Sequence, residues 1–333
     1  MPAGTPSMKL QARFLQLPLL FDAALLAREI ATIPESDWRP HPAGYAGNDF
    51  LPLVAVNGDP SDESFNGPMR ATPHLSPERP YLWQTLASIG AVLGRTRLMR
   101  LSGRAEVSEH ADVNYYWRER MRVHVPIVTQ PAVKFYCGES VAHMAAGECW
   151  IFDTWSLHRV VNDQTHARIH LVADTVGGEH MLQLMAQGRT PDKSSPPGWS
   201  PRAVAPSPER RTVEFESLNV PVVMSPWEIR EHLNFLLAET APNQPAVVEV
   251  ARVASRFVHG WRAAWSVHGD AEAGWPRYQA LLDAFSRDLR AAQAQSLVLV
   301  NEVDLFECIR SMVLEFALTG RGRQSALRIA PGA

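Results

Sequence analysis

The chain has 333 residues, of which 46% are hydrophobic, and it carries a formal net charge of −3. This amount of apolar chain can bury a sizeable core and leaves room for two domains, and the near-neutral charge argues against a nucleic-acid-binding protein. The three cysteines are odd in number and lack the spacing of a zinc site. We therefore expect free thiols, a reducing compartment and a cytoplasmic protein.

The N-terminal part predicts elements that precede the core of the fold. The apolar stretch at 14–21 is short, contains Pro18 and runs into Asp22, which argues against a signal peptide or a membrane span. Asp22 predicts the N-cap of a helix over residues 23–33. The pattern further on predicts a short strand at 51–56, a second helix at 78–93 and a strand at 95–101 that starts a barrel.

His110 and Asp112 form the most informative pair in the chain. In a strand, residues i and i+2 point to the same face, so both side chains can reach one metal ion. Residues 113–128 are rich in β-branched and aromatic residues, which favours a strand over a helix. The polar and aromatic cluster at 114–117 could contact a substrate, although packing is the commoner role of such a cluster.

A third ligand is available in His158, which follows a predicted buried strand at 149–153. A turn at 162–165 then leads to a strand at 168–174, so we expect His158 and Arg168 on adjacent antiparallel strands that face one cavity. Two imidazoles and one carboxylate in the order His-x-Asp…His are the ligand set that holds non-haem Fe(II) with its other side open. Arg168 is placed to bind the distal carboxylate of 2-oxoglutarate through two hydrogen bonds.

These motifs resemble those of a known family. Residues 100–177 are similar to the aspartyl/asparaginyl β-hydroxylase family of Fe(II)- and 2-oxoglutarate-dependent oxygenases, which includes bacterial proline 3-hydroxylases. The matching stretches are residues 110–127, 143–153, 158–162 and 168–174. The resemblance implies a double-stranded β-helix core, Fe(II), 2-oxoglutarate and O2, and hydroxylation at the β-carbon of an amino acid or amino-acid residue.

The resemblance also implies roles for single residues. The residues that match the iron ligands, and hence the catalytic residues, are His110, Asp112 and His158. The residues that match the cosubstrate-binding positions are Arg168, at the distal carboxylate, and Arg122 and His124, near the other end. Asp112 agrees with the bacterial members, because the animal enzyme lacks this carboxylate. Tyr136 stands where many relatives have a histidine.

For the whole chain we predict a β-rich α+β fold. Its double-stranded β-helix (jelly-roll or cupin-like) core spans about residues 95–178, inside an oxygenase domain of residues 1–185 with flanking N-terminal helices. Residues 186–212 are rich in Pro and Ser and predict a flexible linker. Residues 213–325 predict a helical C-terminal domain. Its helices are expected at 225–240, 245–267, 276–295 and 298–319. This domain could cover the barrel, form a homodimer or recognise substrate.

The sequence thus favours an Fe(II)/2-oxoglutarate-dependent dioxygenase that hydroxylates an Asp or Asn side chain, in a peptide or protein. Hydroxylation of a free amino acid such as proline is the nearest alternative. The alternative from another class is a cupin-like metal-binding protein without oxygenase activity, which has no need for Arg168. We expect neither a nucleic-acid nor a membrane partner.

Overall fold

The structure is a computed structural model that describes residues 10, 12–42, 44–191, 197–209 and 211–320. The described chain divides into two compact units. Unit 1 contains the described residues up to Asp112 and those from Glu119 to Ser217, whereas unit 2 contains Val113–Arg118 and the described residues from Leu218 onward. Residues 192–196 and 210 of the predicted linker, and 321–325 of the predicted helical domain, lie outside the described residues.

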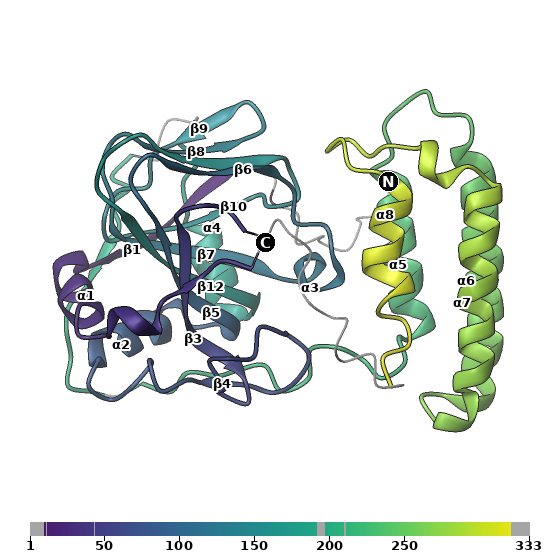
Figure 1. The fold of residues 1–333 in the computed structure, drawn as a ribbon, viewed down its shortest axis with the longest axis horizontal. Coiled ribbons are helices and arrows are strands. Elements are labelled where there is room, and N and C mark those ends of the chain that lie inside the picture. Colours follow the sequence, from purple (N-terminus) through teal and green to yellow (C-terminus); the bar gives the residue numbers. More distant parts are fainter. Residues whose placement is uncertain (1–9, 11, 43, 192–196, 210, 321–333) are drawn as a thin grey trace. The chain divides into compact units, whose positions relative to one another are not determined.

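Unit 1 is built around two β-sheets (Figure 1). The strands are β1 Phe14–Phe21, β2 Arg39–Pro40, β3 Asn48–Val56, β4 Met69–Ala71, β5 Val92–Leu101, β6 Ala105–His110, β7 Met121–Val128, β8 Val133–Cys137, β9 Ser140–Ala142, β10 Glu148–Phe152, β11 His158–Asn162, β12 Arg168–Gly177 and β13 Arg202–Val204. Within the described residues, the larger sheet has the order β13-β1-β10-β7-β12-β5-β3-β2, with β4 paired to β3, and the smaller sheet has the order β6-β11-β8-β9. This mainly antiparallel two-sheet architecture confirms the predicted β-rich α+β fold with a jelly-roll core.

Apolar side chains from both sheets form one buried cluster. Phe14 and Trp150 come from the larger sheet, and Phe135 and Val160 come from the smaller sheet. Burying a side chain of this size contributes roughly 1.5–3 kcal/mol to stability. The helices of unit 1 are α1 Ala23–Ile30, α2 Pro80–Ile89 and α4 Glu179–Ala186. The core therefore holds the strands that carry the predicted site in a fixed register.

The N-terminal helices follow the predictions in part. The N-cap prediction is confirmed, because the Asp22 carboxylate accepts a hydrogen bond from the Leu25 N–H (2.9 Å). The second helix was predicted to reach residue 93, but α2 ends at Ile89. Gly90 adopts the left-handed conformation with φ 61°, which ends the helix, and β5 begins two residues later. Residues 14–21 form β1, which pairs with β10.

Two strand predictions around the candidate ligands are wrong. Residues 113–128 do not form one strand, because helix α3 Tyr115–Arg118 precedes β7. The Asn114 side chain accepts a hydrogen bond from the Trp117 N–H (3.3 Å), which favours a helical turn over an extended chain. His158 and Arg168 do not lie on paired strands either, since β11 belongs to the smaller sheet and β12 to the larger one.

Unit 2 is helical. Besides α3 it contains α5 Pro226–Ala238, α6 Val247–His268, α7 Trp275–Ala291, α8 Leu305–Ile309 and a π-helical segment Arg310–Leu314. Phe257 of α6 stacks on Phe285 of α7, with ring centroids 4.0 Å apart. The helix predicted over 298–319 begins only at Leu305, because Val298 forms an isolated β-bridge with Asp304 and Glu302 has a φ of 66°.

The predicted linker makes specific contacts with unit 1 where the structure describes it. β13 pairs in parallel with β1, and the Tyr81 hydroxyl donates a hydrogen bond to the Val204 carbonyl (2.6 Å). The Trp83 indole N–H donates to the Arg211 carbonyl (2.8 Å). The predicted domain boundaries themselves stay a prediction.

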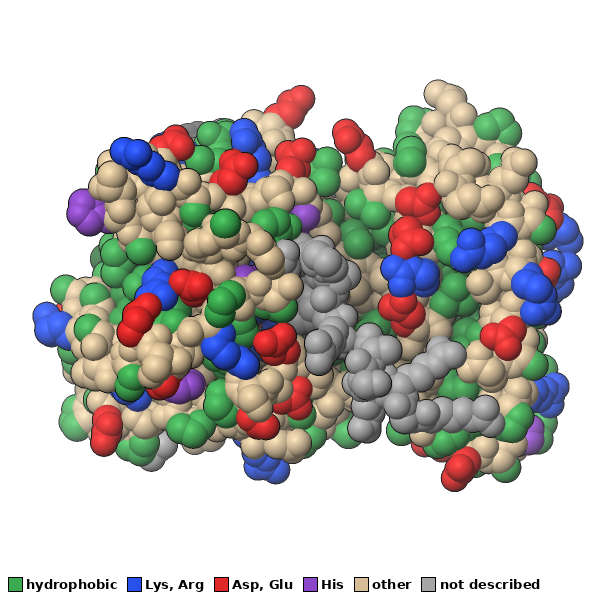
Figure 2. Space-filling model, in the orientation of Figure 1, with side chains coloured by type: hydrophobic (Ala, Val, Ile, Leu, Met, Phe, Trp, Pro, Cys, Tyr) green, Lys and Arg blue, Asp and Glu red, His purple; other side chains and the backbone are tan. Residues whose placement is uncertain are grey.

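On the face shown in Figure 2, acidic and basic side chains are interspersed. None of the helices in the described residues combines the length and hydrophobicity needed to span a bilayer.

Candidate metal and cosubstrate site

His110 and His158 face each other across two paired strands. His110 ends β6 and His158 begins β11, and they are partners in the antiparallel register. Their ring centroids are 4.2 Å apart. Asp112 lies in the loop after β6, not in the strand as we expected, and its N–H donates to the Thr154 carbonyl (2.9 Å). One ligand atom from each of the three residues lies within 4.8 Å of the others.

Backbone carbonyls orient both imidazoles. His110 Nδ1 lies 2.7 Å from the Ser108 carbonyl oxygen, and His158 Nδ1 lies 2.9 Å from the Ser156 carbonyl oxygen. Because a carbonyl can only accept, Nδ1 is the protonated nitrogen in each hydrogen bond. Burial lowers the pKa of His158 to about 4, although Asp112 acts in the opposite direction, so this ring is neutral at pH 7. The Nε2 lone pair of such a ring is available to a metal ion.

The Asp112 carboxylate is buried and has a charged neighbour. Its Oδ2 lies 3.3 Å from Arg122 Nη1. Neither carboxylate oxygen accepts a hydrogen bond from the described residues. Burying a carboxylate without hydrogen bonds is costly unless further positive charge approaches it. Two imidazoles and this carboxylate therefore fit a divalent metal ion such as Fe(II).

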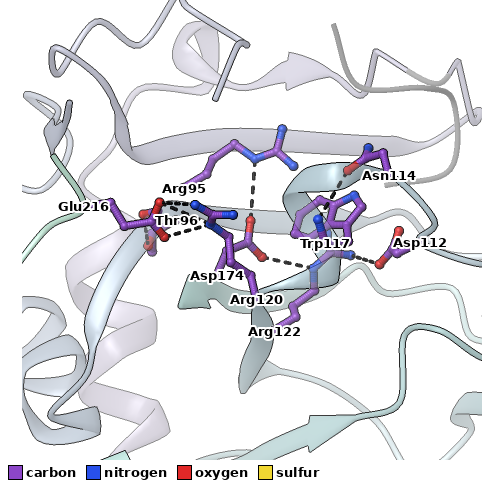
Figure 3. A network of polar contacts seen from close by, with 10 residues as sticks. Arg95, Thr96, Asp112, Asn114, Trp117, Arg120, Arg122, Asp174 and Glu216 are labelled. Carbon is purple, nitrogen blue, oxygen red and sulfur yellow. Dashed lines mark hydrogen bonds and ion pairs between the residues drawn. The ribbon is translucent and has the colours of Figure 1, made fainter. Parts of the chain in front are cut away.

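A buried chain of alternating charges continues from Asp112 (Figure 3). Arg122 on β7 also contacts Asp174 on β12, with Nε 3.2 Å from Oδ1. The second oxygen of Asp174 lies 3.6 Å from Nε of Arg95 on β5. These contacts connect adjacent strands of the larger sheet, because β12 pairs with both β7 and β5. They fix the Arg122 guanidinium beside Asp112.

Arg168 is a buried cation at the start of β12. Its guanidinium carbon lies 5.1 Å from the centre of the Phe135 ring, and its Nε has no acceptor among the described residues. Burial lowers the pKa of Arg168 to about 9, so the group is still protonated at pH 7. A carboxylate from a ligand would satisfy both its charge and its free donor.

His124 lines the same cavity as Arg122 and Arg168. Burial lowers the pKa of His124 well below its usual value, and the nearby charges of Arg122 and Arg168 lower it further, so the ring is neutral. Neither ring nitrogen has a hydrogen-bond partner within the described chain. A neutral imidazole can donate to or accept from a ligand placed beside it.

At Tyr136 many relatives have a histidine. Here the Arg159 guanidinium lies over the Tyr136 ring, 4.3 Å from the ring centre.

The structure brings the predicted residues to one cavity in unit 1. The predicted residues that line it are His110, Arg122, His124, His158 and Arg168, with Asp112 next to Arg122. The sequence analysis missed further lining residues: His41, Tyr45, Asn48 and Arg97. None of the described lining residues is an aspartate or glutamate. The cavity wall therefore carries positive charge and suits anionic ligands.

Arg97 could have been found from the sequence. Arg95 and Arg97 alternate within a predicted strand, so they share one face, and arginine is almost never fully buried without a partner. In the structure both arginine side chains are buried, so each needs a partner or a ligand for its charge. Asn48 gives no comparable signal, because an asparagine at the start of a strand is common at a surface. Its Oδ1 is nevertheless buried and has no donor among the described residues.

Residues 65–177 match the sequence model of a family described as Aspartyl/Asparaginyl beta-hydroxylase. This segment, about a third of the chain, is therefore similar to the aspartyl/asparaginyl β-hydroxylase family. It contains the strands from β5 to β12 and all six predicted site residues. The prediction of an Fe(II)- and 2-oxoglutarate-dependent oxygenase is confirmed by this match, and the donor set fits these cofactors. The roles of these six site residues remain predictions.

Several solved structures are similar to this chain, although remotely. A 2OG-Fe(II) oxygenase from Burkholderia pseudomallei is 14% identical over 46% of this chain and 78% of its own, with a TM-score of 0.33. A Pseudomonas putida prolyl-4-hydroxylase is 14% identical over 50% of this chain and 92% of its own, with a TM-score of 0.33. The epimerase SnoN from nogalamycin biosynthesis is 11% identical over 58% and 91%, with a TM-score of 0.35. No curated protein matches the chain in sequence.

Proposed function

We propose that this chain hydroxylates the β-carbon of an Asp or Asn side chain in a peptide or protein. The observation that carries the proposal is one cavity that combines His110, His158 and the adjoining Asp112 with buried arginines. The three donors suit Fe(II), and the arginines suit carboxylates.

The residues take the following roles in this proposal. Iron is held by His110, Asp112 and His158, the distal carboxylate of 2-oxoglutarate is bound by Arg168, and its other end lies near Arg122 and His124. When bound, Fe(II) with 2-oxoglutarate and O2 supplies the oxidising chemistry that replaces a C–H bond by C–OH and yields succinate and CO2. Phe152 packs edge-on against the His158 ring, with centroids 5.1 Å apart, and keeps water from that side of the site.

The remaining polar groups of the cavity support an Asp or Asn substrate. Arg97 brings a buried positive charge that suits the side-chain carboxylate of Asp. Asn48 Oδ1 needs a donor, which the side-chain amide of Asn would provide. A free amino acid such as proline is the second candidate, because its α-carboxylate suits the same arginine.

Arg168 argues against a cupin-like metal-binding protein without oxygenase activity. Burying a guanidinium whose Nε finds no acceptor in the described chain is costly, and metal binding alone does not offset this cost. A carboxylate cosubstrate does offset it. The position of Arg168 is thus explained by an oxygenase and unexplained by the alternative.

The test is a substrate panel for the full-length, Fe(II)-loaded protein with 2-oxoglutarate, O2 and ascorbate. The panel pairs one peptide sequence containing Asp, Asn, Glu or Gln at its centre with the free amino acids, including proline. We expect a product one oxygen atom heavier from the Asp or Asn peptide and none from the Glu or Gln peptide. Hydroxylation of free proline alone would replace the proposed substrate by the second candidate.

Two further parts of the proposal concern the cell and the assembly. Cys137, Cys149 and Cys308 are all free and buried, which supports a reducing, cytoplasmic location.

We also propose a homodimer through the C-terminal helices. Two apolar side chains on α6 support it, because Val248 and Val267 are 74% and 68% exposed. Sedimentation of the wild-type chain and of a Val248→Ser/Val267→Ser variant tests the dimer.

A further inference from the structure

The turn at 153–157, which joins β10 to β11, makes a hydrogen bond to two of the three candidate iron ligands. The Thr154 carbonyl accepts a hydrogen bond from the Asp112 N–H (2.9 Å). Two residues further on, the Ser156 carbonyl accepts one from Nδ1 of His158 (2.9 Å). All of these residues belong to unit 1. The conformation of the turn therefore affects where Asp112 lies and how the His158 ring is oriented.

The Asp153 side chain closes this turn. Its Oδ2 accepts a hydrogen bond from the Ser156 hydroxyl (2.7 Å), and its backbone carbonyl accepts one from the Ser156 N–H (3.3 Å). The Cys137 thiol on β8 donates to the same carbonyl (3.3 Å). Asp153 is only 3% exposed. The hydrogen bonds between Asp153 and Ser156 thus fix the carbonyl that orients His158.

Arg13, which directly precedes β1, supplies the positive charge beside Asp153. Its Nη1 lies 2.8 Å from Asp153 Oδ2 and also contacts the Ser156 hydroxyl. The backbone joins the same two residues, because the Asp153 N–H donates to the Arg13 carbonyl (3.1 Å). Burying a carboxylate is costly unless a charge partner and hydrogen bonds accompany it. Arg13 therefore offsets the cost of burying Asp153 behind the turn.

Groups that hydrogen-bond a metal ligand fix its tautomer and its orientation, and their loss typically lowers metal affinity by about 10- to 100-fold. We propose that Asp153 positions His158 and Asp112 for metal binding, because it closes the turn whose carbonyls hold both ligands. Asp153 and Ser156 are positioning residues, and Arg13 supports them. This inference rests on the proposed iron site.

The test titrates the full-length, metal-free protein with Co(II), follows the visible absorption of the bound ion, and compares thermal unfolding of the metal-free variants. For Asp153→Ala we expect about tenfold or more weaker Co(II) binding, since the turn loses the carboxylate that closes it. Ser156→Ala removes one hydrogen bond and keeps the carbonyl, so binding should weaken by about three- to tenfold. Arg13→Ala should weaken binding by about threefold, because the Arg13 side chain is 46% exposed. Arg13→Lys keeps the charge and should stay within about twofold of the wild type.

A second readout distinguishes positioning of His158 from general stability. The NMR signals of the histidine rings in the metal-free protein report which ring nitrogen carries the proton. The wild type should show the proton of His158 on Nδ1, where it is donated to the Ser156 carbonyl. Asp153→Ala should shift the population toward the tautomer protonated on Nε2, because this carbonyl is then no longer held in place.

The matched control is Glu148→Ala. The Glu148 carboxylate closes the turn before β10 in the same manner, by accepting hydrogen bonds from the Ala145 N–H (2.7 Å) and the Trp150 indole N–H (2.8 Å). That turn carries none of the three candidate ligands. Glu148→Ala should therefore lower the unfolding temperature and leave the Co(II) affinity and the His158 tautomer unchanged.

Wild-type Co(II) affinity in both Asp153→Ala and Ser156→Ala would overturn the inference, and so would an equal loss of affinity in Glu148→Ala. If Asp153→Ala does not fold, Ser156→Ala decides the question. His158→Ala separates this failure from failure of the iron site. If His158→Ala also binds Co(II) like the wild type, or if the wild type binds none, the proposed function fails as well.

Discussion

Asp112 and Arg122 form a buried ion pair in which Oδ2 and Nη1 are 3.3 Å apart. The same guanidinium contacts Asp174, so its positive charge is shared between two carboxylates. Arg122 therefore orients Asp112 without neutralising it, and negative charge remains for a metal ion. This relationship explains how a carboxylate can be buried beside two imidazoles in a site that we propose binds iron.

Removal of the Asp112 charge should abolish activity and leave the fold intact. For Asp112→Asn we expect at least about 100-fold weaker metal binding and loss of succinate formation, because an amide is a poor ligand for a hard cation. Metal content and circular dichroism are measured on the same preparation. Asp163→Asn, on the exposed turn after β11, is the matched control. Substantial 2-oxoglutarate turnover by Asp112→Asn would contradict the ligand assignment, and the same holds for His158→Ala.

Arg168→Ala should weaken 2-oxoglutarate binding without affecting the metal. Truncation of one partner of a buried, hydrogen-bonded charge pair costs about 2–5 kcal/mol, so the KM for 2-oxoglutarate should rise by about 30-fold or more. Co(II) affinity should stay at the wild-type value. Arg159→Ala, which removes a guanidinium stacked on Tyr136, serves as the control. An unchanged KM would contradict the assignment of the distal carboxylate to Arg168, whereas no binding of 2-oxoglutarate by the wild type would favour the cupin-like alternative.

Asp174→Asn should destabilise unit 1. The substitution replaces by a neutral amide the carboxylate that contacts both Arg95 and Arg122 in the core. Breaking a buried charge pair costs about 3–5 kcal/mol, which urea unfolding of the metal-free protein would detect. Asp49→Asn removes a more exposed partner of Arg100 and should cost less than about 1 kcal/mol. Equal losses for the two variants would show that the buried ion pairs of Asp174 contribute no more to the free energy of unfolding than the exposed pair of Asp49.

His232 should make unit 2 sensitive to acid. Burial lowers the pKa of His232 to about 3, whereas the unfolded chain has the ordinary value near 6.5. As the pH falls, the unfolded state therefore binds the proton first. His232 lowers the free energy of unfolding as the pH drops below 6.5 and has no such effect well above it. Between pH 7.5 and 5.0 this residue alone should account for up to about 2 kcal/mol of lost unfolding free energy.

The measurement for His232 is urea unfolding of the metal-free protein at both pH values. His232→Gln should reduce the loss between pH 7.5 and 5.0, whatever its effect on absolute stability. His259→Gln, at an exposed position on α6, should keep the wild-type loss. If the two variants lose the same unfolding free energy between the two pH values, the lowered pKa of buried His232 is not the source of the acid sensitivity.

The sequence allowed the six site residues to be predicted because they occur in short motifs. His110-x-Asp112 and the segment before His158 depend on local patterns, and the structure places them together. The pairing of β11 and β12 could not be predicted in the same way. A turn signal shows that the chain reverses, but in a fold of two sheets the next strand can join the other sheet, as β12 does.

The helix at 115–118 and the place of Asn48 in the cavity also could not be predicted from the sequence. Tyr115 belongs to a run of aromatic residues with high strand propensity, but its neighbours come from a helical unit more than 100 residues further along the chain. Asn48 reaches the cavity through the pairing of β3 with β5, which is a long-range contact. Such contacts depend on topology, and local periodicity does not encode them.

The most direct test of the account is to measure succinate and hydroxylated product together, in one reaction of the Fe(II)-loaded protein with 2-oxoglutarate, O2 and an Asp- or Asn-containing peptide. We predict that the peptide stimulates succinate formation and that hydroxylated peptide forms in an equal amount. Metal binding without any binding of 2-oxoglutarate would contradict the account and would place the chain among metal-binding proteins with another chemistry.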